Sequence, residues 1–287
     1  MNDGDVIDAH FHVWDLEKLF YSGLTDEMET THVIGDYSPI RRTYLLDEYL
    51  ANASACRVRK AVHVQAAVGH LNPVDETAWI QEVSVAANFP VAIIGHADLR
   101  ESSCGHILDA HMQYPGFRGV RMLSQPGLLD DPAFYRGMRV LSDRGLVFDL
   151  DVDPAEMSSA CKLVAAFPKI QFVLEHVGFP KRTDLNYFKQ WQQAIAELAV
   201  APNVACKLSG LSMIYHEPSP ECFRPWVHHA WDVFGPQRCL FGSNWPFDGL
   251  FSDYPTILRC YLEALTPITD EDRRAFLTAN ASRIYRL

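Results

Sequence analysis

The chain has 287 residues, of which 48% are hydrophobic and 21% are charged, and its formal net charge is -11. This is an ordinary globular composition, and a chain of this length can bury a large core without disulfides or metal ions. The negative charge argues against nucleic acid as a partner, because binding to phosphates requires a basic surface. It still allows a small anionic substrate, since a few local arginines can reverse the field inside a pocket.

The cysteines and the apolar runs predict the cellular compartment. The seven cysteines are an odd number without a Cys-x-x-Cys pair, and Cys206 and Cys239 fall inside apolar runs, so we expect reduced thiols. The opening MNDGDVIDAH is acidic and lacks the apolar segment of a signal peptide. No run approaches the roughly 20 apolar residues that a membrane span needs. We therefore expect a cytoplasmic protein without a membrane partner, and a homo-oligomer is compatible with these features.

Eight short apolar runs alternate with longer segments along the chain. They span Val6–His12, Lys60–Ala67, Pro90–Leu99, Gly119–Leu123, Gly145–Val152, Ile170–Val177, Asn203–Ser209 and Arg238–Ser243. Such nearly continuous apolar runs are typical of strands that are covered on both faces in a parallel sheet. Between them, Asp75–Ala87 and Tyr187–Val200 carry apolar residues three and four apart, which predicts helices.

Eight strand-then-helix units in fewer than 300 residues predict a (β/α)8 TIM barrel, with a single domain over residues 1–287. A doubly wound open sheet is the alternative. Polar residues favour the barrel, because they follow most of the strands, where the active-site loops of barrels begin, and not one switch point. Residues 14–59, between the first two strands, are expected to form an insertion over the barrel mouth.

Two histidine-containing runs are the strongest signals of chemistry. His10 and His12 end the first strand, and alternation places them on the same side. Two neutral imidazoles at this spacing can hold a divalent ion or polarise a carbonyl oxygen. His176 ends the sixth strand, where a core histidine bonded to a backbone carbonyl is the alternative. Alternation predicts that Glu175 points away from the lumen if His176 points into it.

Two cations are predicted to face the pocket. Arg121 ends the fourth strand and Lys207 lies on the seventh, where either can recognise a substrate carboxylate. The alternative is a structural ion pair with Asp149 or Asp98. Three further residues are expected to contribute to the pocket: Gln65, Trp245 and Asp149.

Several motifs together resemble one family. IDAHFHVWD, VHVQA, RGVRM, LEHVGFP, CKLSGL, FGSNWP and the closing TANASRIYRL resemble the amidohydrolase-2 branch of the amidohydrolase superfamily. They are most similar to its sugar-lactone hydrolases, of the fuconolactonase and rhamnonolactonase type, and to 2-pyrone-4,6-dicarboxylate lactonase. The resemblance implies that His10, His12 and His176 match histidines that bind a divalent metal in some members. In metal-free lactonases the matching histidines polarise the substrate carbonyl.

The chain departs from the family at Asn244, where the family usually has an Asp that activates water. An amide cannot accept a proton at neutral pH, so Asn244 is expected to orient water or substrate. We expect Asp248 to be the general base, with Asp149 as the second candidate. The fifth strand reads VFDLDV and lacks the histidine common in metal-dependent members, although Asp149 could supply an oxygen ligand.

These features predict either no cofactor or one weakly held divalent metal, with zinc as the expected ion, on His10, His12 and His176. The predicted function is a lactonase that opens a small, anionic lactone of a sugar acid or an aromatic breakdown product. A metal-dependent decarboxylase of the same branch is one alternative. A second alternative is a lactone isomerase or a non-catalytic barrel that binds sugar acids. Asn244 supports this alternative, because an amide at that position cannot act as the base for hydrolysis.

Overall fold

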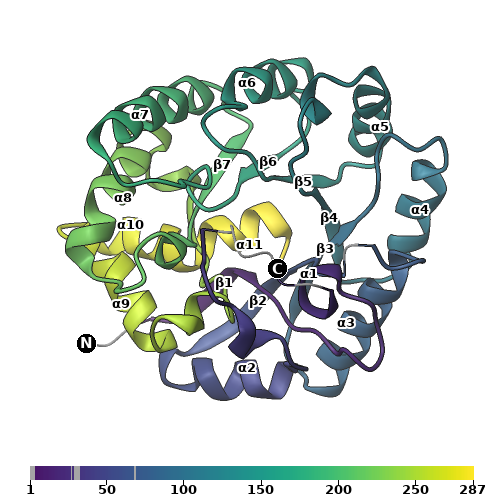
Figure 1. Cartoon of the computed structure of the whole chain (residues 1–287), viewed down its shortest axis with the longest axis horizontal. Helices are drawn as coiled ribbons and strands as arrows, with labels where there is room; N and C mark the ends of the chain where they lie inside the picture. The colour runs from purple at the N-terminus through teal and green to yellow at the C-terminus, as the bar shows by residue number, and fades with distance from the viewer. Residues whose placement is uncertain (1–3, 27, 29–32, 68) are drawn as a thin grey trace.

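The computed structural model describes residues 4–26, 28, 33–67 and 69–287. Eight parallel strands follow one another in chain order, each hydrogen-bonded to the next (Figure 1). They are β1 (Val6–Phe11), β2 (Val58–Val64), β3 (Val91–His96), β4 (Phe117–Met122), β5 (Val147–Leu150), β6 (Phe172–Leu174), β7 (Val204–Leu208) and β8 (Cys239–Phe241). The ring closes where Asn244 N donates to His10 O over 2.8 Å and His12 N donates to Trp245 O over 2.7 Å. The predicted TIM barrel is confirmed.

Helices surround the ring of strands (Figure 1), as parallel crossovers require. They are α1 (Ser22–Thr25), α2 (Leu46–Ala53), α3 (Val74–Ala86), α4 (Cys104–His111), α5 (Pro132–Asp143), α6 (Met157–Ala166), α7 (Leu185–Ala199), α8 (Pro220–Phe234), α9 (Tyr254–Leu265), α10 (Asp270–Arg274) and α11 (Asn280–Tyr285). Several begin at a side chain that accepts a backbone N–H of the first turn, namely Asp131, Asp184, Ser219, Asp253 and Thr269. The two helices predicted from periodicity correspond to α3 and α7. No helix among the described residues is long and apolar enough to cross a membrane.

The C-terminal helix α11 closes the end of the barrel at which the strands begin. Asn280 donates to Cys239 O and Arg118 donates to Tyr285 O, which ties α11 to the starts of β8 and β4. Ala281, Ile284 and Tyr285 pack against the small aliphatic core inside the ring. The active-site cavity is therefore restricted to the opposite end, where the strands finish.

The segment between β1 and β2 borders that open end before it joins the helix layer. Trp14 and Tyr44 exchange backbone hydrogen bonds of 2.8 and 2.9 Å, which join these two positions of the segment side by side. Side chains from α1 and from Ile34 and Tyr37 line the cavity described below. After this loop, α2 packs beside α9 on the outside of the barrel.

The sixth strand ends earlier than the apolar run predicts. β6 stops at Leu174, and His176, Val177 and Phe179 have φ of 49°, 49° and 44°. These values lie in the left-handed region, which breaks the alternation of side chains along a strand. The prediction that Glu175 points away from the lumen is therefore wrong. Glu175 is 1% exposed and lies inside the barrel.

Candidate active site

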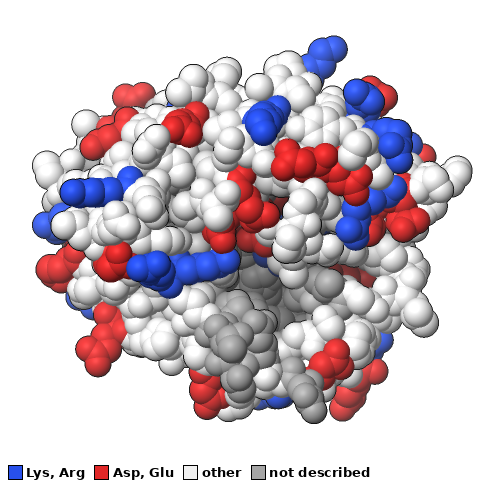
Figure 2. Space-filling view, turned by 45° about the horizontal axis from the view of Figure 1, so that its top comes forward, with Lys and Arg blue, Asp and Glu red and all other residues white. Residues whose placement is uncertain are grey.

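A cavity of about 850 Å³ opens at the end of the barrel where the strands finish. Four of the predicted site residues line it: His12, Arg121, His176 and Asn244. Its wall combines apolar side chains such as Trp14 and Phe247 with the acidic residues Asp151, Asp153, Glu156 and Glu175. Figure 2 shows this hollow with acidic and basic side chains on its rim. The volume suits one small organic substrate.

The three predicted histidines meet on one side of the cavity floor. His10 Nε2 and His12 Nε2 lie 3.0 Å apart, and the ring centroids of His10 and His176 are 4.5 Å apart. Burial lowers the pKa of His10 and His12 well below the ordinary value and that of His176 to about 3. All three rings are therefore neutral near pH 7. His12 and His176 line the cavity, whereas His10 is fully buried behind them.

The loop after β7 makes room for His176. Gly210 has φ of 70°, and a Cβ on it would lie 2.5 Å from His176 Nδ1. The preceding residue, Ser209, places its Oγ 2.9 Å from the same nitrogen. The Ser-Gly pair after Leu208 therefore both makes space for the ring and fixes its orientation.

Asp8, which the sequence analysis did not single out, anchors the strand that carries His10 and His12. It is fully buried and accepts hydrogen bonds from Ser243 Oγ, Tyr254 OH and Tyr49 OH over 2.6, 2.8 and 2.9 Å. These partners lie in the β8 loop, α9 and α2, so Asp8 ties the barrel wall to its outer layer. An apolar strand that contains a carboxylate was the available signal.

Beneath the histidines lies a cluster of buried charges. Arg121 donates to Glu175 over 3.0 Å and Lys207 donates to Asp149 over 2.5 Å, with Lys207 Nζ also 3.7 Å from Glu175 Oε1. Tyr285 OH donates to the other oxygen of Asp149 over 2.9 Å. Burial alone would raise the pKa of Glu175, but attraction to Arg121 and Lys207 holds it below the ordinary value. The ion pair of Lys207 with Asp149 is the structural alternative considered for Lys207.

Several predicted pocket residues are not on the cavity wall. Within the described part of the chain, the wall does not include Lys207, Asp149, Gln65 or Trp245. Gln65 contributes its carbonyl oxygen, which accepts a hydrogen bond from Arg121 over 2.5 Å. Lys207 and Asp149 lie within β7 and β5 and pair with each other, and Trp245 packs against Tyr254 of α9.

Asn244 and Asp248 form a pair at the seam between β1 and β8. Asn244 has φ of 53° and donates its side-chain amide to Asp248 Oδ1 over 2.8 Å. Asp248 is fully buried behind Asn244, outside the cavity wall. Burial raises the pKa of Asp248 to about 7, and the hydrogen bond from Asn244 opposes that rise.

Asp151 is a carboxylate on the cavity wall itself. It follows β5 and accepts a hydrogen bond from Ser124 N over 3.1 Å through Oδ2. Burial and the nearby charge of Glu175 raise the pKa of Asp151 to about 6. On the same wall, Lys181 is paired with Asp153 over 2.7 Å.

Comparison with known proteins identifies the family. The amidohydrolase family model matches residues 7–287. The chain belongs to the amidohydrolase family. Uncharacterized protein y4mH of Sinorhizobium fredii is 37% identical to this chain over 299 residues, and the match covers 100% of both proteins. An L-fucono-1,5-lactonase of Burkholderia ambifaria is 28% identical over 291 residues, which covers 98% of this chain and 95% of that protein.

The fold of this amidohydrolase also matches solved structures. A crystal structure of an amidohydrolase from Burkholderia multivorans with bound zinc has a TM-score of 0.82 and 26% identity, and the match covers 99% of this chain and 100% of that one. The predicted resemblance to sugar-lactone hydrolases is therefore confirmed at the level of the family, and the chain is a hydrolase of that family.

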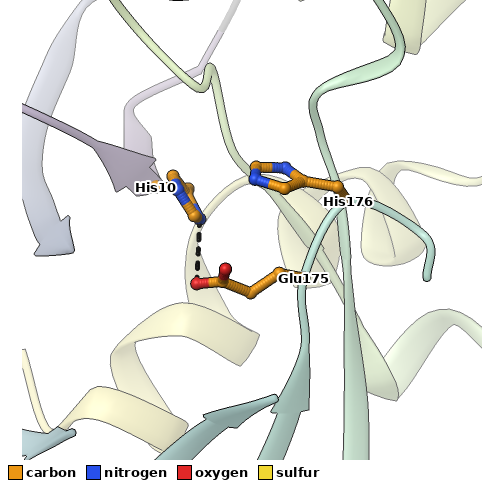
Figure 3. Close-up of side chains that lie close together, drawn as sticks. All are labelled: His10, Glu175 and His176. Carbon is orange, nitrogen blue, oxygen red and sulfur yellow. Dashed lines mark ion pairs between the residues drawn. The ribbon is translucent and has the colours of Figure 1, made fainter. Parts of the chain in front are cut away.

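The donors in this amidohydrolase do not fit a tightly held divalent metal. In favour of a metal, ligand atoms of His10, Glu175 and His176 lie within 4.8 Å of one another (Figure 3). Against it, the Lys207 ammonium lies 3.3 Å from His10 Nδ1, and Arg121 is paired with Glu175. Two fixed positive charges at the donors repel a dication. In addition, residue 244 offers an amide where the family usually has a carboxylate.

Proposed function

We propose that this amidohydrolase opens the lactone ring of a sugar acid by adding water. Three neutral imidazoles and the Asn244–Asp248 pair gather at one cavity: His12, His176 and Asn244 line its wall, and His10 and Asp248 lie buried behind them. This grouping is the observation that carries the proposal, because lactone hydrolysis needs hydrogen-bond donors for the carbonyl and a base for water. The similarity to an L-fucono-1,5-lactonase over nearly the whole chain supports the same class of substrate.

The residues divide the steps of such a reaction between them. Arg121 and His176 donate hydrogen bonds to the carbonyl oxygen, and the Ser209 hydroxyl donates to His176 Nδ1 so that the Nε2–H faces the substrate. Asn244, on the cavity wall, orients the water. We assign the proton of that water, released as the new C–O bond forms, to Asp248, which lies behind Asn244 and which the water must reach past that amide. Asp151, a carboxylate on the cavity wall, is the alternative acceptor. The bond from the carbonyl carbon to the ring oxygen then breaks. The ring oxygen takes the proton that the carboxylate accepted from water, and the product is a hydroxy acid.

The charges on the cavity wall favour an uncharged ring that carries hydroxyl groups. Among the residues that the structure describes, four acidic side chains line the cavity, against the two cations Arg121 and Lys181. Both cations are already paired, with Glu175 and Asp153 respectively. A substrate carboxylate would therefore meet a net negative wall. We propose a neutral lactone in place of the anionic one expected from Arg121 and Lys207 alone.

A pH-indicator screen of lactones tests this function. Purified protein is assayed against five- and six-membered lactones of sugar acids, with acid release as the signal, and each hit is repeated with Asn244→Ala and Asp248→Asn. We expect hydrolysis of at least one neutral sugar lactone, with a large loss of rate in Asp248→Asn. Absence of hydrolysis across the panel, together with release of carbon dioxide from aromatic acids, would replace the lactonase by the decarboxylase alternative.

A further inference from the structure

Lys207 lies inside the barrel in direct contact with His10. Its side chain is fully buried, and its Nζ lies 2.5 Å from Asp149 Oδ2, 3.7 Å from Glu175 Oε1 and 3.3 Å from His10 Nδ1. Asp149 accepts a hydrogen bond from the ammonium group, and Glu175 places a second buried carboxylate beside it. An ammonium group has three N–H donors and no acceptor, so its contact with His10 requires a lone pair on Nδ1.

That requirement determines where the proton of His10 lies. A positively charged ring beside the ammonium would be repelled, so His10 is neutral and carries one proton. With a lone pair on Nδ1, the proton is on Nε2, which faces His12 Nε2 at 3.0 Å. His12 accepts it there, because its own Nδ1–H is donated to Val64 O over 2.7 Å. Every donor between Lys207 and Val64 then has an acceptor.

The opposite tautomer has a competing partner. Glu175 Oε1 lies 3.5 Å from His10 Nδ1, and a proton on Nδ1 would point to that oxygen. Both Nε2 atoms would then present lone pairs to each other across 3.0 Å, which is stable only with a cation between them. The contact of His10 Nδ1 with Lys207 Nζ, at 3.3 Å, is shorter than its contact with Glu175 Oε1, at 3.5 Å, and Arg121 holds the other oxygen of Glu175, Oε2.

We propose that Lys207 is a positioning residue that holds His10 in the Nε2–H tautomer and thereby makes the His10–His12 pair a hydrogen-bonded unit instead of a metal chelate. Lys207 is itself held by Asp149, which Tyr285 of the C-terminal helix fixes through its hydroxyl. The choice between hydrogen-bonded and metal-binding histidines thus depends on residues beneath the cavity, outside the cavity wall.

Nitrogen-15 NMR of the histidine side chains in the wild-type protein tests the tautomer directly. Histidine-labelled protein is compared with a His10→Gln variant to assign the His10 signals. We expect a bare Nδ1 and a protonated Nε2 on His10 at pH 7. The tautomer is measured on the wild-type protein and needs no activity and no variant of Lys207; the His10→Gln variant serves only to assign the signals. A His10 with its proton on Nδ1 would overturn the proposal.

Zinc binding by a charge-free variant tests the consequence. Lys207→Met alone leaves Asp149 as an unpaired buried charge, so the experiment uses Lys207→Met combined with Asp149→Asn, which still accepts from Tyr285. We expect the double variant to bind zinc at least about 10-fold more tightly than the wild type, measured by calorimetry and metal analysis after dialysis. Lys181→Met, which removes the cavity-wall lysine that is paired with Asp153, is the control and should leave zinc affinity unchanged. Equal zinc affinity in a folded double variant and the wild type would contradict the role of Lys207.

Discussion

Asn244 donates its side-chain amide to the Asp248 carboxylate over 2.8 Å, and the backbone of Asp248 donates back to Asn244 O over 3.2 Å. The two residues are thus locked together in one turn after β8. The family to which the chain is similar usually has the carboxylate at position 244. Here the carboxylate stands four residues later, in contact with the amide that replaces it, and we interpret the two as one functional unit.

This interpretation predicts the effect of removing the carboxylate. Asp248→Asn should lower kcat by roughly 10²–10⁴-fold, the usual scale for a lost general base, with a smaller change in KM. Asn244→Asp alone places two carboxylates in contact and should also lower the rate at pH 7. The exchange variant Asn244→Asp/Asp248→Asn keeps one carboxylate and one amide and should recover much of the activity. Wild-type kcat in Asp248→Asn would remove Asp248 from the reaction, and a large loss in Asp151→Asn would then assign the base to Asp151.

Stability measurements separate this loss from unfolding. The pKa of Asp248 is raised from 3.8 to about 7, so the folded protein favours the protonated form. The stability that this carboxyl contributes is full below about pH 4 and is lost as the pH rises through about 7. Asn cannot ionise, so Asp248→Asn should melt at a higher temperature than the wild type at pH 8. A lower melting temperature at that pH would indicate a structural role.

The same raised pKa predicts the pH profile of the wild-type enzyme. A base must be ionised to accept a proton, so kcat/KM should fall as the pH decreases below about 7, with a slope of one proton. The three histidines are neutral well below this range and should add no further limb. Initial rates from pH 5 to 9 measure the profile. A limb near pH 6 would instead match the pKa of Asp151.

The buried ion pair of Glu175 with Arg121 should contribute strongly to the stability of the folded protein. It is 1% exposed and is paired with Arg121, and its replacement leaves that guanidinium without a carboxylate partner in the barrel. Breaking a buried ion pair by removing one partner typically costs about 3–5 kcal/mol. We expect Glu175→Gln to lower the free energy of unfolding by about that amount in urea titrations. Asp5→Asn, which removes an exposed carboxylate from Arg57 and Arg59, is the control and should have a far smaller effect. A change in Glu175→Gln no larger than in this control would show that the buried pair is not needed.

The sequence was sufficient for the barrel and for the residues that open onto the cavity. Apolar runs at regular spacing require a parallel sheet, and His12, Arg121, His176 and Asn244 all follow strands, where a barrel places its site. The position of Glu175 could not be predicted, because it depends on the left-handed turn that begins at His176. A single sequence does not show where a strand ends within a continuous apolar run.

The ion-pair partners of the buried charged residues could not be predicted from the sequence either. Lys207 lies on β7 and Asp149 on β5, with β6 between them, and the two residues are 58 positions apart in the chain. Their pairing depends on which side of each strand faces the lumen. Long-range contacts of this kind follow from the register of the sheet. Lys207, which the sequence offered as a partner for a substrate carboxylate, is therefore paired with Asp149 instead, and the expected substrate changes from an anionic to a neutral lactone.

The preference of the enzyme for a neutral or an anionic substrate can be measured with pairs of lactones that differ only in a carboxylate. The sequence predicted an anionic substrate, and the structure favours a neutral one. We expect kcat/KM for a neutral sugar lactone to exceed that for the same ring bearing a carboxylate by at least about 10-fold, because Asp151, Asp153, Glu156 and Glu175 line the cavity. Asp151→Asn should reduce the ratio of these two kcat/KM values, by raising kcat/KM for the carboxylated lactone and lowering it for the neutral one. It removes a negative charge that repels the carboxylate, and it weakens a hydrogen bond from a substrate hydroxyl to a charged oxygen, a contact of about 1.5–3 kcal/mol. Asp109→Asn, on an outer helix and paired with Arg144, changes the net charge equally and should alter neither value. A wild-type enzyme that prefers the carboxylated ring would show that Arg121 is free to bind it in spite of Glu175.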